Sequence, residues 1–135
     1  MDRPFLDANV LFSAAYRRES GLSRLWALPD ARLVTSHYAV EEARRNLDAA
    51  RQRDRLAELL DALEVVPEAP ERTLPADIQL PQKDRPILQA AIAAQATHLL
   101  TGDLTHFGPY YGRTIAGIRI ESPGDYLRRV ERSDS

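Results

Sequence analysis

The chain contains no cysteine among its 135 residues. This absence excludes disulfide bridges and thiolate metal sites, and it is typical of proteins that work in a reducing compartment. No stretch approaches the ~18 consecutive apolar residues of a membrane-spanning helix. The first ten residues, MDRPFLDANV, do not combine a basic head with a long apolar run, as a secretion signal would. We therefore expect a cytoplasmic protein with no membrane partner.

An excess of positive charge is also missing, because the net charge is −2 and the sequence pI is near 5.9. Proteins that bind nucleic acids through their overall charge are usually basic. If this chain binds phosphates, basic residues must gather locally, and metal ions can add to the positive field. Each basic residue taken alone is more ordinarily a solvated surface charge. The candidates are Arg17, Arg18, Arg44, Arg45, Lys83, Arg85 and Arg113.

The length predicts one domain over residues 1–135, with a core from about residue 4 to about residue 130 and a short polar C-terminal tail. A chain of this size buries roughly two-thirds of its unfolded surface, so it needs no covalent staples. Short apolar runs predict strands over residues 4–7, 32–36, 64–66 and 97–101, with a last strand within 114–122. Helical patterns cover residues 10–17, 22–28, 37–50, 53–63, 84–96 and 123–133.

Two local features complete this outline. Asn9 is a candidate cap for the first helix, and the proline-rich residues 67–82 predict a long loop. Strands that alternate with helices favour an α/β fold with a mainly parallel sheet and helices on both faces.

Four acidic residues stand where the predicted strands and helices begin or end: Asp7, Glu42, Asp84 and Asp103. In an α/β fold, such places converge outside the carboxyl ends of the strands. Carboxylates gathered there would repel one another, and a divalent cation is the usual remedy. The sequence therefore predicts a metal site with oxygen ligands.

Each acid also has an ordinary structural interpretation. Asp7 could bond backbone N–H groups in a strand-to-helix turn, and Asp84 could cap the helix that follows it. Glu42 lies nearer than Glu41 to the apolar face of its predicted helix, so we select Glu42 and expect Glu41 to face water.

The three histidines, His37, His98 and His106, show no metal-binding spacing among themselves. His106 follows Asp103 closely and could contact a substrate, although a surface or packing role is the more ordinary interpretation. The chain has neither a GxGxxG nor a GxxxxGK[ST] motif, so the sequence gives no support for dinucleotide or Walker-type nucleotide sites.

The segments FLDANVLFSAA, TSHYAVEEARRNL and KDRPILQAAIAAQATHLLTGD, in this order, resemble the PIN-domain family of metal-dependent nucleases. The resemblance implies a three-layer α/β/α fold with a central, mainly parallel sheet, and hydrolysis of RNA phosphodiester bonds. It assigns the acidic cluster of the family to Asp7, Glu42, Asp84 and Asp103, which would bind Mg²⁺ or Mn²⁺. Asn9 and Thr101 occupy supporting polar positions.

The ending IESPGDYL is similar to that of bacterial PIN proteins, including VapC-type toxins of toxin–antitoxin pairs. RNA as substrate, an antitoxin protein and a second copy of this chain are therefore the candidate partners. One alternative is a non-catalytic PIN-like module that binds RNA or a protein. Another is an α/β phosphatase with Asp7 as nucleophile, which is disfavoured because DANVL lacks the second acid of a DxDx[TV] motif.

Overall fold

A computed structural model describes residues 1–71 and 74–133 of the chain. Its described part contains a sheet with the strand order β3-β2-β1-β4-β6-β5. All neighbouring strands are parallel except β5, which runs antiparallel to β6. The strands are β1 (Pro4–Leu6), β2 (Val34–Ser36), β3 (Glu64–Val66), β4 (His98–Leu100), β5 (Thr114–Ile115) and β6 (Ile118–Glu121). The mainly parallel α/β fold predicted from the sequence is thereby confirmed.

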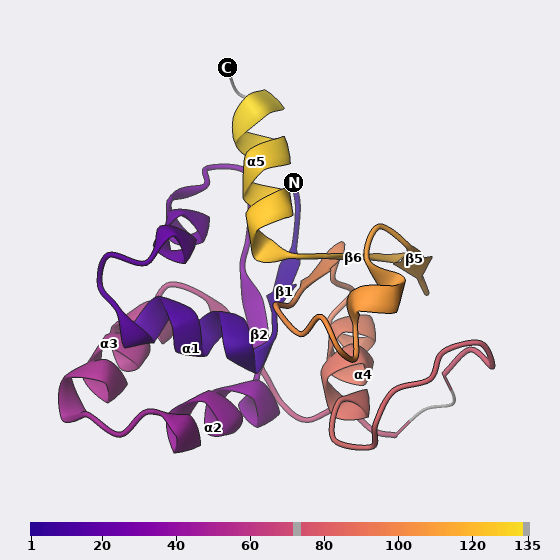
Figure 1. The fold of residues 1–135 in the computed structure, drawn as a ribbon, viewed down its shortest axis with the longest axis horizontal. Helices are drawn as coiled ribbons and strands as arrows, with labels where there is room; N and C mark the ends of the chain where they lie inside the picture. The colour runs from indigo at the N-terminus through magenta and orange to yellow at the C-terminus, as the bar shows by residue number, and fades with distance from the viewer. Residues whose placement is uncertain (72–73, 134–135) are drawn as a thin grey trace.

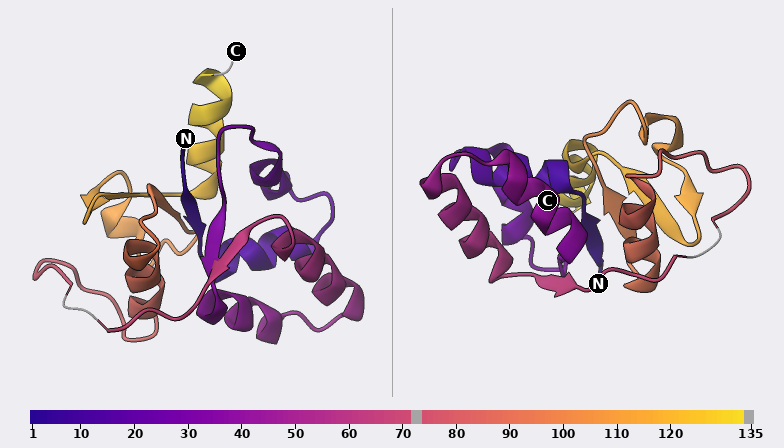
Figure 2. Two further views of the ribbon diagram at one scale, coloured as in Figure 1. Left: turned by 180° about the vertical axis from the view of Figure 1, so that it is seen from behind. Right: turned by 90° about the horizontal axis from the view of Figure 1, so that it is seen from below.

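Helices lie on both sides of this sheet (Figures 1 and 2). They are α1 (Ala8–Tyr16), α2 (His37–Asn46), α3 (Ala50–Leu60), α4 (Arg85–Ala93) and α5 (Pro123–Ser133), with 3₁₀ helices η1 (Gly21–Ala27) and η2 (Gly108–Tyr110). The helices α1, α2 and α3 group together on one side, and α4 lies on the other. Right-handed crossovers require this division, because the chain moves outward from β1 to β3 and then returns to β4 on the other side.

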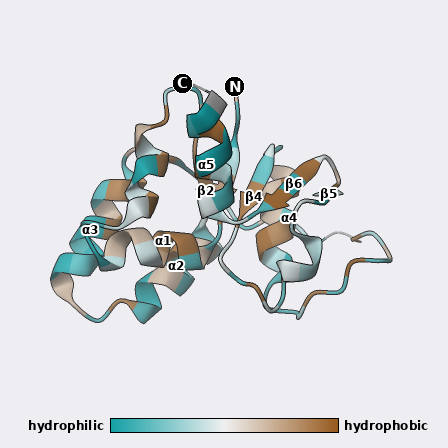
Figure 3. Ribbon diagram, turned by 45° about the horizontal axis from the view of Figure 1, so that its top comes forward, coloured by the Kyte–Doolittle hydropathy of each residue, from teal (hydrophilic) through white to brown (hydrophobic). Residues whose placement is uncertain are grey.

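The central strands form the core because both of their faces are covered. Phe5, Leu6, Leu99 and Leu100 are fully buried, as continuous apolar runs in parallel strands require. Figure 3 shows this hydrophobic centre and the hydrophilic outer end of α5. Among the described residues, no helix combines the length and the apolar character needed to cross a membrane.

Several predicted boundaries were wrong. Asp7 rather than Asn9 caps α1, because the Asp7 side chain accepts the N–H of Ala8. Residues 21–27 form the 3₁₀ helix η1 instead of an α-helix, and the helix expected over 37–50 ends at Asn46.

The last predicted strand is a hairpin made of β5 and β6. Its turn places Ala116 and Gly117 at φ 52° and 83°, which is the backbone conformation of tight hairpin turns. The predicted loop after β3 contains no helix or strand in its described residues, and residues 72–73 of it lie outside the described part.

Candidate active site

The four selected acids line one pocket of about 500 Å³ at the carboxyl ends of the strands. Asp7 follows β1 and Asp103 follows β4, while Glu42 lies on α2 and Asp84 directly precedes α4. Because β1 and β4 are parallel neighbours, their carboxyl ends present Asp7 and Asp103 at the same edge of the sheet. The pocket is lined by Asp7, Ala8, Asn9, Phe12, Glu42, Ala43, Asn46, Lys83, Asp84 and Asp103.

Asp7 is the most buried of the four acids, with 4% of its surface exposed. Its Oδ1 accepts the N–H of Ala8 at 2.7 Å, and its Oδ2 accepts the hydroxyl of Thr101 at 2.8 Å. Burial raises the pKa of Asp7 from 3.8 to about 6; these two hydrogen bonds oppose the rise, and Glu42 and Asp84 add to it. The site thus concentrates negative charge that the surrounding residues only partly neutralise.

Asn9 and Thr101 connect the turns that follow β1 and β4. The amide nitrogen of Asn9 donates to Asp7 Oδ2 at 3.2 Å and to the Thr101 hydroxyl at 3.3 Å, while its oxygen accepts the N–H of Gly102 at 2.8 Å. The Thr101 hydroxyl in turn accepts the N–H of Asp103 at 3.1 Å. These bonds fix the position of the Asp7 carboxylate relative to the Asp103 backbone.

His106 lies between two of the acids, a contact that the sequence interpretation had missed. Its Nδ1 is 2.8 Å from Asp84 Oδ2 and 2.8 Å from Asp103 Oδ2, but only the contact with Asp103 has hydrogen-bond geometry. Asp84 Oδ2 is therefore buried without a hydrogen-bond donor within the described residues. Burial also raises the pKa of Asp84, and Asp103 adds to the rise while His106 opposes it.

The only sequence signal for His106 was its distance of three residues from Asp103. In the structure, this spacing is a turn in which the backbone N–H of His106 donates to Asp103 Oδ1 at 3.0 Å. The contact with Asp84 joins His106 to a residue of another loop, and no local sequence pattern predicts it.

The carboxylates of this pocket fit a hard divalent cation. One ligand atom from each of Asp84, Asp103 and His106 lies within 4.8 Å of the others. Asp7 and Glu42 lie outside this group but line the same pocket. Carboxylate oxygens are the ligands that Mg²⁺ and Mn²⁺ prefer, and the buried Asp84 Oδ2 that lacks a donor is an oxygen that a cation would satisfy.

The two adjacent acids on α2, Glu41 and Glu42, lie in different environments. Glu41 is exposed and pairs with Arg44 on the same helix, whereas Glu42 is half-buried and lines the pocket. This placement follows from the apolar face of α2, where Ala39, Val40 and Ala43 are buried.

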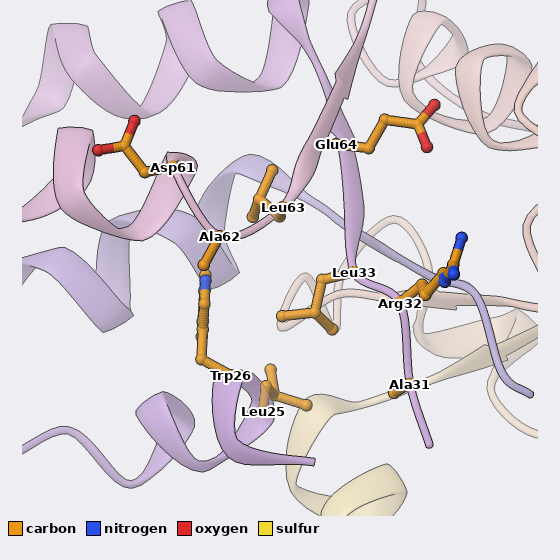
Figure 4. A pocket seen from close by; sticks show the side chains of 9 residues that line it. All are labelled: Leu25, Trp26, Ala31, Arg32, Leu33, Asp61, Ala62, Leu63 and Glu64. Carbon is orange, nitrogen blue, oxygen red and sulfur yellow. The ribbon is translucent and has the colours of Figure 1, made fainter. Parts of the chain in front are cut away.

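Another pocket, of about 430 Å³, lies at the amino ends of β2 and β3 (Figure 4). Its walls include Trp26, Leu33 and Leu63, and its acids Asp61 and Glu64 point away from each other. Glu64 is already paired with Arg3 at 2.9 Å. Because its acids diverge, this pocket offers no shared cation position, and the pocket at the carboxyl ends is the better candidate.

Comparison with known proteins gives both a sequence match and matches in fold. The family described as PIN domain matches residues 3–105. No curated protein sequence matches the chain. Solved structures similar in fold include VapBC2 from Rickettsia felis bound to a DNA fragment from its promoter, with a TM-score of 0.62 at 17% identity. The alignment covers 89% of this chain and 98% of the other.

Two further solved structures have the same overall likeness. VapBC-1 from nontypeable Haemophilus influenzae has a TM-score of 0.56 at 14% identity, covering 90% of this chain and 98% of the other. VapC20 from Mycobacterium tuberculosis, described as a toxin that cleaves the Sarcin-Ricin loop, has a TM-score of 0.51 at 14% identity, with coverage of 86% and 98%. At such identities, the likeness concerns the fold.

Proposed function

This chain belongs to the PIN-domain family, and from that premise we propose that it is a metal-dependent ribonuclease that hydrolyses RNA phosphodiester bonds. The observation that carries the proposal is the convergence of Asp7, Glu42, Asp84 and Asp103 on one pocket. No structural requirement brings together four acids from four separate segments. Their mutual electrostatic repulsion makes the cluster unfavourable unless a cation binds there.

The cation is Mg²⁺ or Mn²⁺ in this proposal. Asp84 and Asp103 would hold it together with Asp7 and Glu42, directly or through water, and His106 lies within reach. When bound, such a cation lowers the pKa of a coordinated water and offsets negative charge on the phosphate.

The other residues of the pocket position these groups and the substrate. Thr101 and Asn9 hold the Asp7 carboxylate through the hydrogen bonds described above, as partners of metal ligands commonly do. Lys83 lines the pocket beside Asp84 and supplies a positive charge for the RNA backbone. Phe12 lines the same pocket and offers an aromatic face on which a base can stack.

A toxin role within a toxin–antitoxin pair is the finer part of the proposal. Its support is the likeness in fold to chains of two VapBC complexes and to VapC20, described as a toxin that cleaves the Sarcin-Ricin loop. An antitoxin protein is accordingly the proposed partner, and it would restrain cleavage until the toxin is released.

Incubation of the purified protein with a panel of single-stranded and structured RNAs tests the proposal. We expect cleavage with Mn²⁺ or Mg²⁺, none with EDTA, and none by Asp7→Asn, because this change removes a carboxylate from the site without changing its shape. Asp54→Asn, on the exposed surface of α3, is the matched control and should cleave normally. Undiminished metal-dependent cleavage by Asp7→Asn would refute the assignment. RNA binding without any cleavage would favour the non-catalytic module.

A further inference from the structure

A second polar pocket, of about 380 Å³, lies at the far end of α1 from the acidic site. Four arginines and one glutamate contribute its charge, in a chain whose net charge is −2. The pocket is lined by Ala15, Tyr16, Arg17, Arg18, Glu19, Arg51, Gln52 and Arg55. We call it the arginine pocket.

Three of the four arginines of this pocket differ from many others in the chain because they have no carboxylate partner within the described residues. Arg17, Arg18 and Arg51 are exposed and form no ion pair within 4.0 Å in the described part of the chain. Elsewhere, ion pairs with carboxylates are formed by Arg3, Arg24, Arg44, Arg113, Arg119, Arg128 and Arg129. Arg55 pairs with Glu58 at 3.6 Å, but the other three arginines of the pocket hold positive charge that no carboxylate of the described residues neutralises within 4.0 Å.

Arg55 adds a buried donor to this group. Its Nε is buried and has no hydrogen-bond partner among the described residues, while its Nη1 lies 3.6 Å from Glu58. A buried N–H without an acceptor is unfavourable. An anionic oxygen bound in the pocket would supply the missing acceptor.

Two aromatic side chains connect the arginine pocket to the acidic site. Phe12 lines the acidic site and Tyr16 lines the arginine pocket. Their rings stack with centroids 5.3 Å apart at an angle of 27°, and Tyr16 is 49% exposed. The nine residues of α1 rise ~13 Å along the helix axis. The two pockets thus lie at opposite ends of one short helix, with a stacked aromatic pair between them. Figure 1 shows the course of this helix, α1.

We propose that the arginine pocket is a phosphate subsite for the RNA substrate, whose strand runs from the acidic site across Phe12 and Tyr16. This inference rests on the proposed ribonuclease function. Guanidinium groups match the geometry of phosphate oxygens, and bases stack on exposed aromatic rings whatever their sequence. An acidic protein segment is the rival occupant, but it would leave the aromatic pair unused. RNA engages arginines, aromatic rings and acidic site in one continuous strand.

The test compares RNA binding by two double variants, each made in the Asp7→Asn background so that the RNA stays intact. Arg17→Ala/Arg51→Ala removes two charges from the arginine pocket, and Arg32→Ala/Arg128→Ala removes two exposed charges elsewhere. Each lost phosphate contact reduces the slope of log K against log salt by about 0.7 for a single strand. We expect the arginine-pocket double variant to reduce the magnitude of this slope by about 1.4, and the control double variant to leave the slope unchanged. Equal slopes in the two pairs would overturn the subsite.

Cleavage in the otherwise native background separates this inference from the ribonuclease proposal. Arg17→Ala/Arg51→Ala should raise KM about tenfold for long RNA and leave kcat unchanged. An oligonucleotide too short to extend beyond the acidic site should be cleaved by this variant as efficiently as by the native chain. Arg17→Lys/Arg51→Lys should recover most of the affinity. If the native chain cleaves no RNA, the function proposal fails, while the salt slopes still decide the subsite. If the alanine pair weakens binding of an acidic peptide but not of RNA, the subsite is refuted.

Discussion

Asp7 has two opposing effects on the stability of the folded protein. Its carboxylate caps α1 and holds the turn after β1, yet burial raises its pKa to about 6. A group whose pKa is raised in the folded state is protonated there more readily than in the unfolded chain. The contribution of Asp7 to the free energy of unfolding is then largest below pH 3.8, falls as the pH rises through about 6, and is constant above that value.

Because burial of the charged Asp7 carboxylate is unfavourable, we predict that Asp7→Asn stabilises the metal-free protein at neutral pH. The shift from 3.8 to about 6 corresponds to about 3 kcal/mol. Because the amide loses an acceptor for Asn9, we expect a net gain of about 1–2 kcal/mol. Urea unfolding with EDTA at pH 4 and pH 7 measures it: the difference between variant and native chain should appear only at the higher pH. A native chain that is more stable than the variant at pH 7 would contradict the prediction.

His106 is the residue whose role the structure changes most. Since its Nδ1 lies 2.8 Å from both Asp84 and Asp103, its removal should disturb the ligands even if it does not bind the cation itself. We expect His106→Ala to weaken Mn²⁺ binding about 10- to 100-fold. Calorimetric titration measures this, with the exposed His37→Ala as control. Unchanged affinity in His106→Ala would remove His106 from the site.

At the scale of elements, the sequence predicted those strands and helices that local patterns determine. The short apolar runs at β1, β2 and β4 were recognisable because these strands are buried on both faces. The 3₁₀ character of η1 and the hairpin of β5 and β6 were missed. The hairpin depends on the backbone conformations of Ala116 and Gly117, and not on a repeating pattern.

Helix α2, which carries Glu42, begins with a buried cap. The Ser36 hydroxyl accepts the N–H of Ala39 at 3.2 Å, and Ser36 is fully buried. Ser36→Ala should therefore lower the free energy of unfolding by about 1 kcal/mol. A lower midpoint of urea unfolding at an unchanged slope would show it, whereas the exposed Ser13→Ala should have no such effect. A midpoint equal to that of the native chain would show that the cap does not stabilise α2.

At the scale of the whole molecule, the gathering of four acids was predictable and the finer ligand geometry was not. Parallel neighbouring strands bring Asp7 and Asp103 to the same edge, so the order of elements alone places them together. The arrangement of Asp84, Asp103 and His106 depends on how two loops meet, and no spacing in the sequence encodes that meeting. The arginine pocket likewise joins residues from α3 and from the chain after α1.

The central claim is that these carboxylates together bind a divalent cation. Electron paramagnetic resonance of Mn²⁺ tests it directly, because the signal of the free aqueous ion decreases as the ion binds protein. We predict that the native chain decreases the signal saturably, and that Asp84→Asn/Asp103→Asn leaves it close to that of Mn²⁺ alone. A native chain that leaves the signal unchanged at millimolar Mn²⁺, or a double variant that binds as well as the native chain, would contradict the account.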